Sequence, residues 1–142
     1  MSLPTVAERG STSQDVVVVR SVLLVDDSDF ERVIIRSAVE GFTNFRVCGE
    51  ASNGVEGIKK AIELKPDLVV MDLAMPLMNG LEAASVLNNT MPKVPIVLLT
   101  LYADQIHGPK SAAAFGVTVV LSKFDGLTPL LQCLRRLLGS PS

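Results

Sequence analysis

The chain has 142 residues, enough for one domain with a single buried core, and its net charge is −2. This balance supplies no basic surface for nucleic acid, and no apolar stretch is long enough to span a bilayer. The apolar content of 48% with few aromatic residues fits an α/β domain. Cys48 and Cys133 lie in unrelated segments, and we expect two buried free thiols in a reducing cytoplasm.

Both ends of the chain differ in composition from the middle. Residues 1–14 are polar, contain Pro, Gly and Ser, and show no periodicity, so we interpret residues 1–17 as a disordered N-terminal tail. Residues 139–142 form a short C-terminal tail. The segment between them, residues 18–138, is expected to fold as one domain.

Five short apolar runs alternate with helical patterns across residues 18–138. Near-continuous apolar runs of this kind are typical of strands that are buried on both faces of a parallel sheet. Their alternation with helices favours an α/β, doubly wound, five-stranded parallel sheet with five helices. The predicted strands are 18–25, 45–51, 68–71, 96–99 and 117–121.

The helical patterns carry recognisable start and stop signals. Asp27 or Ser28 is predicted to cap the first helix, 29–40, and Gly41 to end it. The second helix is predicted at 54–64 and the third from about 79 to 87. Gly108-Pro109 interrupts the fourth pattern, within 103–115, so we expect that helix to be short, shifted or late-starting. Thr128 is the predicted N-cap of the fifth helix.

Polar side chains follow four of the five predicted strands. Asp26 and Asp27 follow the first strand, Asp72 follows the third, Thr100 the fourth, and Lys123 comes shortly after the fifth. Ligands of open parallel sheets bind outside the carboxyl ends of the strands. Three acids, a hydroxyl and an ammonium group at one edge therefore predict a site for a divalent cation and a phosphoryl group.

These residues carry a resemblance to a known family. The chain resembles the receiver domain of two-component response regulators over residues 18–138. The resemblance implies a flavodoxin-like sheet with strand order 2-1-3-4-5. The matching pieces are Val25-Asp26-Asp27-Ser28, Val70-Met71-Asp72, Met75-Pro76-Leu77-Met78-Asn79-Gly80, Leu98-Leu99-Thr100 and Leu121-Ser122-Lys123.

The resemblance also implies residue roles. Asp72 is the expected phosphoryl acceptor, while Lys123 and Thr100 are expected to bind the phosphoryl oxygens. Asp27 and Asp72, with a backbone carbonyl near Ala74, are expected to hold Mg²⁺, and Asp26 to assist directly or through water. A carboxylate is a competent nucleophile toward phosphorus, and the remaining groups supply positioning and charge stabilisation.

The expected partner is a sensor histidine kinase, and small phosphate donors are expected to substitute for it. A downstream protein, or an output domain outside this chain, is expected to respond. The protein would be cytoplasmic, with no direct nucleic acid or membrane partner, and would catalyse only its own phosphorylation and dephosphorylation. Homodimerisation is left open.

Three residues depart from the family pattern. Val120 stands where receivers usually carry an aromatic residue, and Leu101 is bulkier than the usual residue after the hydroxyl. Phe124 replaces the usual proline, so we expect a trans peptide bond before it. These departures keep a second interpretation open, namely a binding-only pseudo-receiver.

Two further inferences concern the chemistry. Ala74 has no polar side chain to orient a water molecule, and Tyr102 could shield the phosphoryl group, so we expect slow self-dephosphorylation. A phosphatase with an Asp-x-Asp nucleophile is a third hypothesis, suggested by Asp27-Ser28-Asp29. Glu31 stands where such enzymes carry a hydroxyl residue, which argues against that hypothesis.

Overall fold

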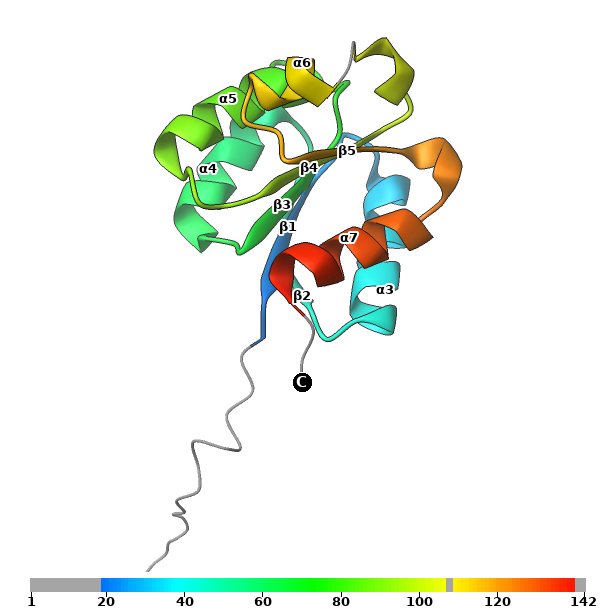
Figure 1. The fold of residues 1–142 in the computed structure, drawn as a ribbon. Helices are drawn as coiled ribbons and strands as arrows, with labels where there is room; N and C mark the ends of the chain where they lie inside the picture. The colour runs from blue at the N-terminus through cyan, green and yellow to red at the C-terminus, as the bar shows by residue number, and fades with distance from the viewer. Residues whose placement is uncertain (1–18, 107–108, 140–142) are drawn as a thin grey trace, which may run out of the picture.

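The computed structural model describes residues 19–106 and 109–139, and their five strands form one parallel sheet in the order β2-β1-β3-β4-β5 (Figure 1). This is the order that the resemblance predicted. The tail predicted for residues 1–17 lies outside the described residues, as do residues 140–142. The strands are β1 (Ser21–Val25), β2 (Arg46–Ala51), β3 (Leu68–Met71), β4 (Ile96–Thr100) and β5 (Val119–Ser122).

The helices cover both faces of the sheet (Figure 1). One face packs against α3 (Asp29–Phe42) and α7 (Thr128–Leu138), and the other against α4 (Gly54–Leu64), α5 (Gly80–Thr90) and α6 (Pro109–Ala113). Strand β1 shows the alternation, because Val22 and Leu24 belong to the α3–α7 core while Leu23 and Val25 belong to the opposite core. Two short 3-10 helices, η1 (Ala103–Gln105) and η2 (Lys123–Asp125), complete the described elements.

Strand β3 and helix α4 have the predicted bounds, whereas β5 begins later than predicted. The backbone N–H of Val117 donates to the carbonyl of Ala112, so this residue still belongs to the turn that follows α6. Helix α6 begins at Pro109, where a missing N–H removes no helical hydrogen bond. The helix expected to be short, shifted or late-starting is both short and late-starting.

Two predicted helix signals are wrong. Gly41 does not end α3, which continues to Phe42, and the C-cap residue Thr43 donates both its N–H and its hydroxyl to the carbonyl of Val39. Thr128 does not cap α7 but is its first helical residue. The carbonyl of Leu127 already accepts from the N–H of Leu131, so helical bonding begins one residue earlier than predicted.

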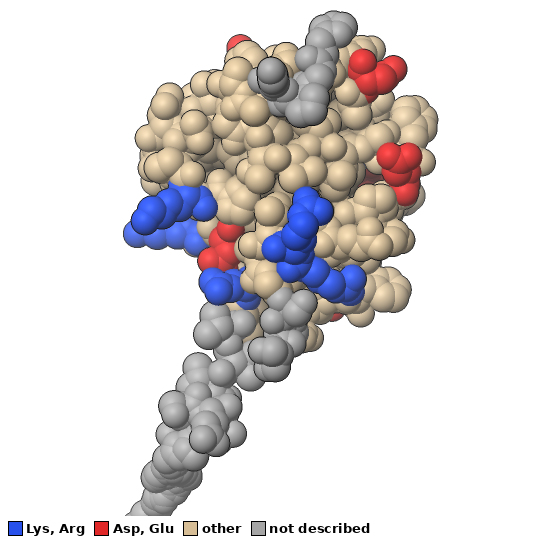
Figure 2. All heavy atoms as spheres, viewed as in Figure 1, with Lys and Arg blue, Asp and Glu red and all other residues tan. Residues whose placement is uncertain are grey.

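Charged side chains are sparse on the face shown in Figure 2, where Lys and Arg gather toward the lower end. Arg135 and Arg136 lie in the last turn of α7, and the Arg135 guanidinium donates to the carbonyl of Phe42 at 2.5 Å, which joins α7 to the end of α3. Cys48 and Cys133 are both free thiols, but only Cys133 is buried. In the part of the chain described, no helix has the length and apolar character needed to cross a bilayer.

Candidate functional site at the carboxyl edge of the sheet

Strand register brings the predicted polar groups to one edge of the sheet. Val25 pairs with Met71, and Met71 pairs with Leu98, so the residues after β1 and β3 lie at the same level beside the end of β4. Asp26, Asp72 and Thr100 are all buried there, although each carries a polar side chain. Buried polar groups are expensive unless they are paired, which marks this edge as a candidate site.

Three carboxylates gather at this edge. One carboxylate oxygen from each of Asp26, Asp27 and Asp72 lies within 4.8 Å of the other two. Asp27 is exposed, so the cluster opens to solvent on one side. Oxygen donors of this type, few in number and open to water, fit Mg²⁺, which retains several water ligands. Ala74 lies two residues after Asp72, exposed in the loop between β3 and α5.

Lys123 reaches this cluster from η2. Its Nζ lies 2.7 Å from Asp26 Oδ2, 3.2 Å from Glu31 Oε1 and 3.3 Å from Asp72 Oδ2, while only 9% of its side chain is exposed. Glu31 is the member of this group that the sequence analysis did not assign to the site. Its position in the first turn of α3 indicates a helix-capping residue, a signal that does not predict contact with Lys123.

Burial and neighbouring charges shift the pKa values of Asp72 and Lys123. Burial, together with the charge of Asp26, raises the pKa of the Asp72 carboxyl, although Lys123, Thr100 and the N–H of Leu73 favour the carboxylate. Burial alone would lower the pKa of the Lys123 ammonium. Its hydrogen bonds to Asp26 and Glu31 and the charge of Asp72 outweigh burial, so that pKa is raised and Lys123 stays protonated.

Backbone hydrogen bonds hold the loops that carry the acids. The N–H of Ser28 donates to Asp26 Oδ1 at 2.9 Å, and the guanidinium of Arg32 donates to the backbone carbonyl of Asp26. The N–H of Leu73 donates to Asp72 Oδ1 at 2.7 Å. These contacts orient the carboxylates of Asp26 and Asp72 within their loops.

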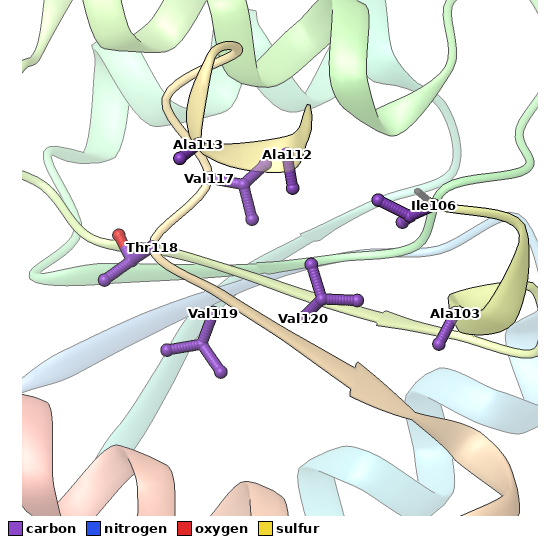
Figure 3. Close-up of a pocket in the computed structure, with 8 residues that line it drawn as sticks. All are labelled: Ala103, Ile106, Ala112, Ala113, Val117, Thr118, Val119 and Val120. Carbon is purple, nitrogen blue, oxygen red and sulfur yellow. The ribbon is translucent and has the colours of Figure 1, made fainter. Parts of the chain in front are cut away.

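The residues that depart from the family pattern lie beside this edge. Val120 lines an apolar hollow of about 510 Å³ between β5, η1 and α6, and its side chain points into that hollow (Figure 3). Leu101 follows Thr100 and is half exposed. The described peptide bonds include no cis bond, so Phe124 follows a trans bond as predicted.

The response regulator receiver domain model matches residues 22–135. This chain belongs to the response regulator receiver domain family. Receiver domains of this family typically bind Mg²⁺ in an acidic pocket and act in phosphorelay signalling. The flavodoxin-like strand order of the structure agrees with that membership.

Relatives of the receiver include longer proteins. The chain is 36% identical to the response regulator GacA of Pseudomonas viridiflava over 114 residues, which cover 80% of this chain and 53% of GacA. It is 45% identical over 90 residues to a protein-glutamate methylesterase/protein-glutamine glutaminase of Methanosarcina acetivorans, covering 63% of this chain and 25% of that protein. The chain thus spans about half of one relative and a quarter of the other.

A solved receiver domain has a similar fold. The crystal structure of the response regulator domain of CheB from Thermotoga maritima matches with a TM-score of 0.77 and 28% identity, covering 87% of this chain and 100% of that one. The likeness to the methylesterases concerns the receiver domain alone, and it shows no esterase activity for this chain.

Proposed function

We propose that this receiver accepts a phosphoryl group on Asp72 from a sensor histidine kinase and passes the change to a partner. The observation that carries the proposal is the contact of one buried ammonium, Lys123 Nζ, with both Asp26 and Asp72 beside a cluster of three carboxylates. This arrangement combines a nucleophilic carboxylate with a fixed cation next to it.

In the proposed transfer step, the phosphoryl group passes from a nitrogen of the donor to a carboxylate oxygen of Asp72. A carboxylate oxygen of Asp72 forms a bond to phosphorus while the P–N bond breaks, and the nitrogen takes the bond electrons. With phosphoramidate, whose nitrogen is already protonated, the leaving group is ammonia. Lys123 neutralises charge on the phosphoryl oxygens, and the Thr100 hydroxyl donates to one of them.

The metal site in this proposal is built from Asp26, Asp27, Asp72 and the backbone carbonyl of Ala74. Support comes from the carboxylate oxygens, which lie within 4.8 Å of one another. Bound Mg²⁺ would neutralise the charge that builds up as two anionic groups approach. The proposed receiver unit runs over residues 18–138.

The partner assignments are also part of the proposal. We expect a histidine kinase as the donor and a separate protein or output domain as the reader, since the chain spans about half of GacA. A cytoplasmic location fits the two free thiols, Cys48 and Cys133, because a reducing compartment preserves them.

Intact-mass analysis after incubation with Mg²⁺ and phosphoramidate tests this function. We expect one phosphoryl adduct in the wild type and in Asp125→Asn, a control for an exposed aspartate outside the acidic cluster. The adduct should be absent from Asp72→Asn. A folded wild-type protein that gains no adduct would overturn the proposal in favour of the binding-only receiver. An adduct that persists in Asp72→Asn would assign the acceptor elsewhere.

A further inference from the structure

Among the described helices, α3, α4 and α5 carry glutamate at the third helical position, and the glutamate of α3 makes a different contact. In α5, Glu82 accepts a hydrogen bond from the N–H of its N-cap residue Asn79 at 3.0 Å. In α4, Glu56 accepts from the N–H of Ser52 at 2.8 Å. Both carboxylates therefore satisfy a backbone donor at the start of their own helix, which is the ordinary use of glutamate at this position.

The equivalent residue of α3, Glu31, has no such role. Its N-cap residue, Ser28, donates its backbone N–H to Asp26 Oδ1 at 2.9 Å, so this donor is already engaged by the acidic cluster. The carboxylate of Glu31 instead lies 3.2 Å from Lys123 Nζ. Glu31 is thus directed at the site by the same contact that orients Asp26.

The Lys123 ammonium is shared among three carboxylates. A lysine ammonium has three N–H donors, and the Lys123 ammonium contacts three carboxylates, those of Asp26, Glu31 and Asp72. A phosphoryl group that arrives on Asp72 needs a donor from the same ammonium. The incoming phosphoryl oxygen therefore competes with these carboxylates for the ammonium.

The three contacts differ in how readily they can be released. The side chains of Asp26 and Asp72 are only 4% and 10% exposed, so a released carboxylate there would lose its partner without gaining full hydration. The side chain of Glu31 is 35% exposed, so water can replace the lysine. The contact with Glu31 is therefore the one that gives way.

We propose that Glu31 is a positioning residue that slows phosphorylation by holding Lys123 away from the incoming phosphoryl group and by adding a fourth negative charge to the site. This inference rests on the proposed function, because it concerns the rate of the same transfer to Asp72. It predicts that removing the charge of Glu31 increases the rate of phosphoryl transfer to Asp72. Loss of a merely structural contact would not increase a reaction rate.

The test measures the rate constant of adduct formation from phosphoramidate at saturating Mg²⁺ by intact mass. Saturation separates the transfer step from any change in Mg²⁺ affinity. For Glu31→Gln, a substitution close in shape, we expect a rate about threefold to tenfold above wild type, the range for one partly screened charge contact. Adduct formation should be faster in Glu31→Ala as well, since this substitution removes both the charge and the hydrogen-bond acceptor.

Glu82→Gln is the matched control, because it removes the same charge from the same helical position without touching Lys123. It should react within twofold of the wild type. Equal rates for wild type and Glu31→Gln, a slower Glu31→Gln, or an equal acceleration in Glu82→Gln would each overturn this inference while leaving Asp72 as the acceptor. A wild type that forms no adduct would overturn the proposed function, and this inference with it.

Discussion

Lys123 Nζ lies 2.7 Å from Asp26 Oδ2 and 3.3 Å from Asp72 Oδ2, so the ammonium pairs more closely with the acid after β1 than with the proposed acceptor. The same carboxylates belong to the cluster that would bind a divalent cation. Lys123 would therefore compete with a bound Mg²⁺ for the same two carboxylates. Such competition would make Mg²⁺ bind more tightly when the lysine is removed, whereas a variant that merely disturbed the fold would bind Mg²⁺ more weakly.

We expect Lys123→Met to bind Mg²⁺ about threefold to tenfold more tightly than the wild type, because a competing cation has been removed. Asp27→Asn should weaken binding by about tenfold through the loss of one charged ligand. Tyr102, the only tyrosine in a chain without tryptophan, reports on the site by fluorescence, since its N–H donates to Thr100 Oγ1 at 3.1 Å. Lys59→Met, on the exposed side of α4, is the control. Unchanged or weaker binding in Lys123→Met would show that no such competition exists.

Ala74→Asn should shorten the life of the phosphoryl group. Ala74 is exposed beside the proposed acceptor, and it has no side-chain group to orient an attacking water. An asparagine supplies a donor and an acceptor there, so we expect loss of the adduct to accelerate about tenfold, within the range for one positioning group. The half-life is measured by intact mass after the donor is removed. A half-life in Ala74→Asn equal to or longer than that of the wild type would refute the predicted slow self-dephosphorylation.

The buried strands and the polar residues that follow them could be predicted from local sequence, whereas the strand order was predicted from the resemblance to receiver domains. The apolar runs 68–71 and 96–99 are long enough to identify buried strands, and Asp72 and Thr100 follow them directly. Topology then brings the strand ends together without further information. The end of α3 could not be predicted in this way, because Gly41 carries the usual stop signal and only the structure shows that Thr43 is the C-cap residue.

Glu31 shows a second limit of sequence reasoning. Its position after Ser28 indicates a capping residue, and the same signal describes Glu82 correctly. The difference arises because the N–H of Ser28 is already bound by Asp26, an interaction that depends on how the acidic loop folds. Competition between acceptors for one donor is a property of the folded chain, and no periodicity reveals it.

Two glycines should respond to alanine in opposite ways. A Cβ on Gly80, at the start of α5, would collide with the backbone carbonyl oxygen of Asp72, whereas a Cβ on Gly41 would meet nothing within 4 Å. We expect Gly80→Ala to lower the free energy of unfolding by about 2 kcal/mol through overpacking. Gly41→Ala should raise it by roughly 0.5–1 kcal/mol, because alanine loses less entropy in a helix.

Urea unfolding measures the free energy of unfolding of both glycine variants, and Mg²⁺ titration measures their affinity for Mg²⁺. Gly80→Ala should also bind Mg²⁺ more weakly, since the displaced carbonyl belongs to a member of the acidic cluster. Gly41→Ala should bind Mg²⁺ as the wild type does. If Gly80→Ala were as stable as the wild type, the tight packing of α5 against the end of β3 would be disproved.

Glu50 should stabilise the fold in a pH-dependent manner. Its carboxylate lies 2.9 Å from Arg32 Nε and 2.5 Å from Arg36 Nη1, which joins β2 to α3. Burial raises the pKa of Glu50, but the hydrogen bonds from Arg36 and Arg32 outweigh it and hold the pKa below its usual value of 4.5. Because the pKa of Glu50 is lowered in the folded state, its ion pairs contribute fully to the free energy of unfolding above pH 4.5. This contribution disappears as the pH falls through the pKa of Glu50 in the folded protein.

Urea unfolding of Glu50→Gln at several pH values checks this expectation. At pH 7 we expect the variant to be less stable than the wild type by roughly 1 kcal/mol, because the pairs are partly exposed and screened. The difference should shrink progressively as the pH drops below 4.5, where the wild-type carboxylate becomes protonated. Glu63→Gln, on the exposed side of α4, should show no such trend. A deficit in Glu50→Gln that stays constant down to acidic pH would mean that its cause is lost packing and not the ion pairs with Arg32 and Arg36.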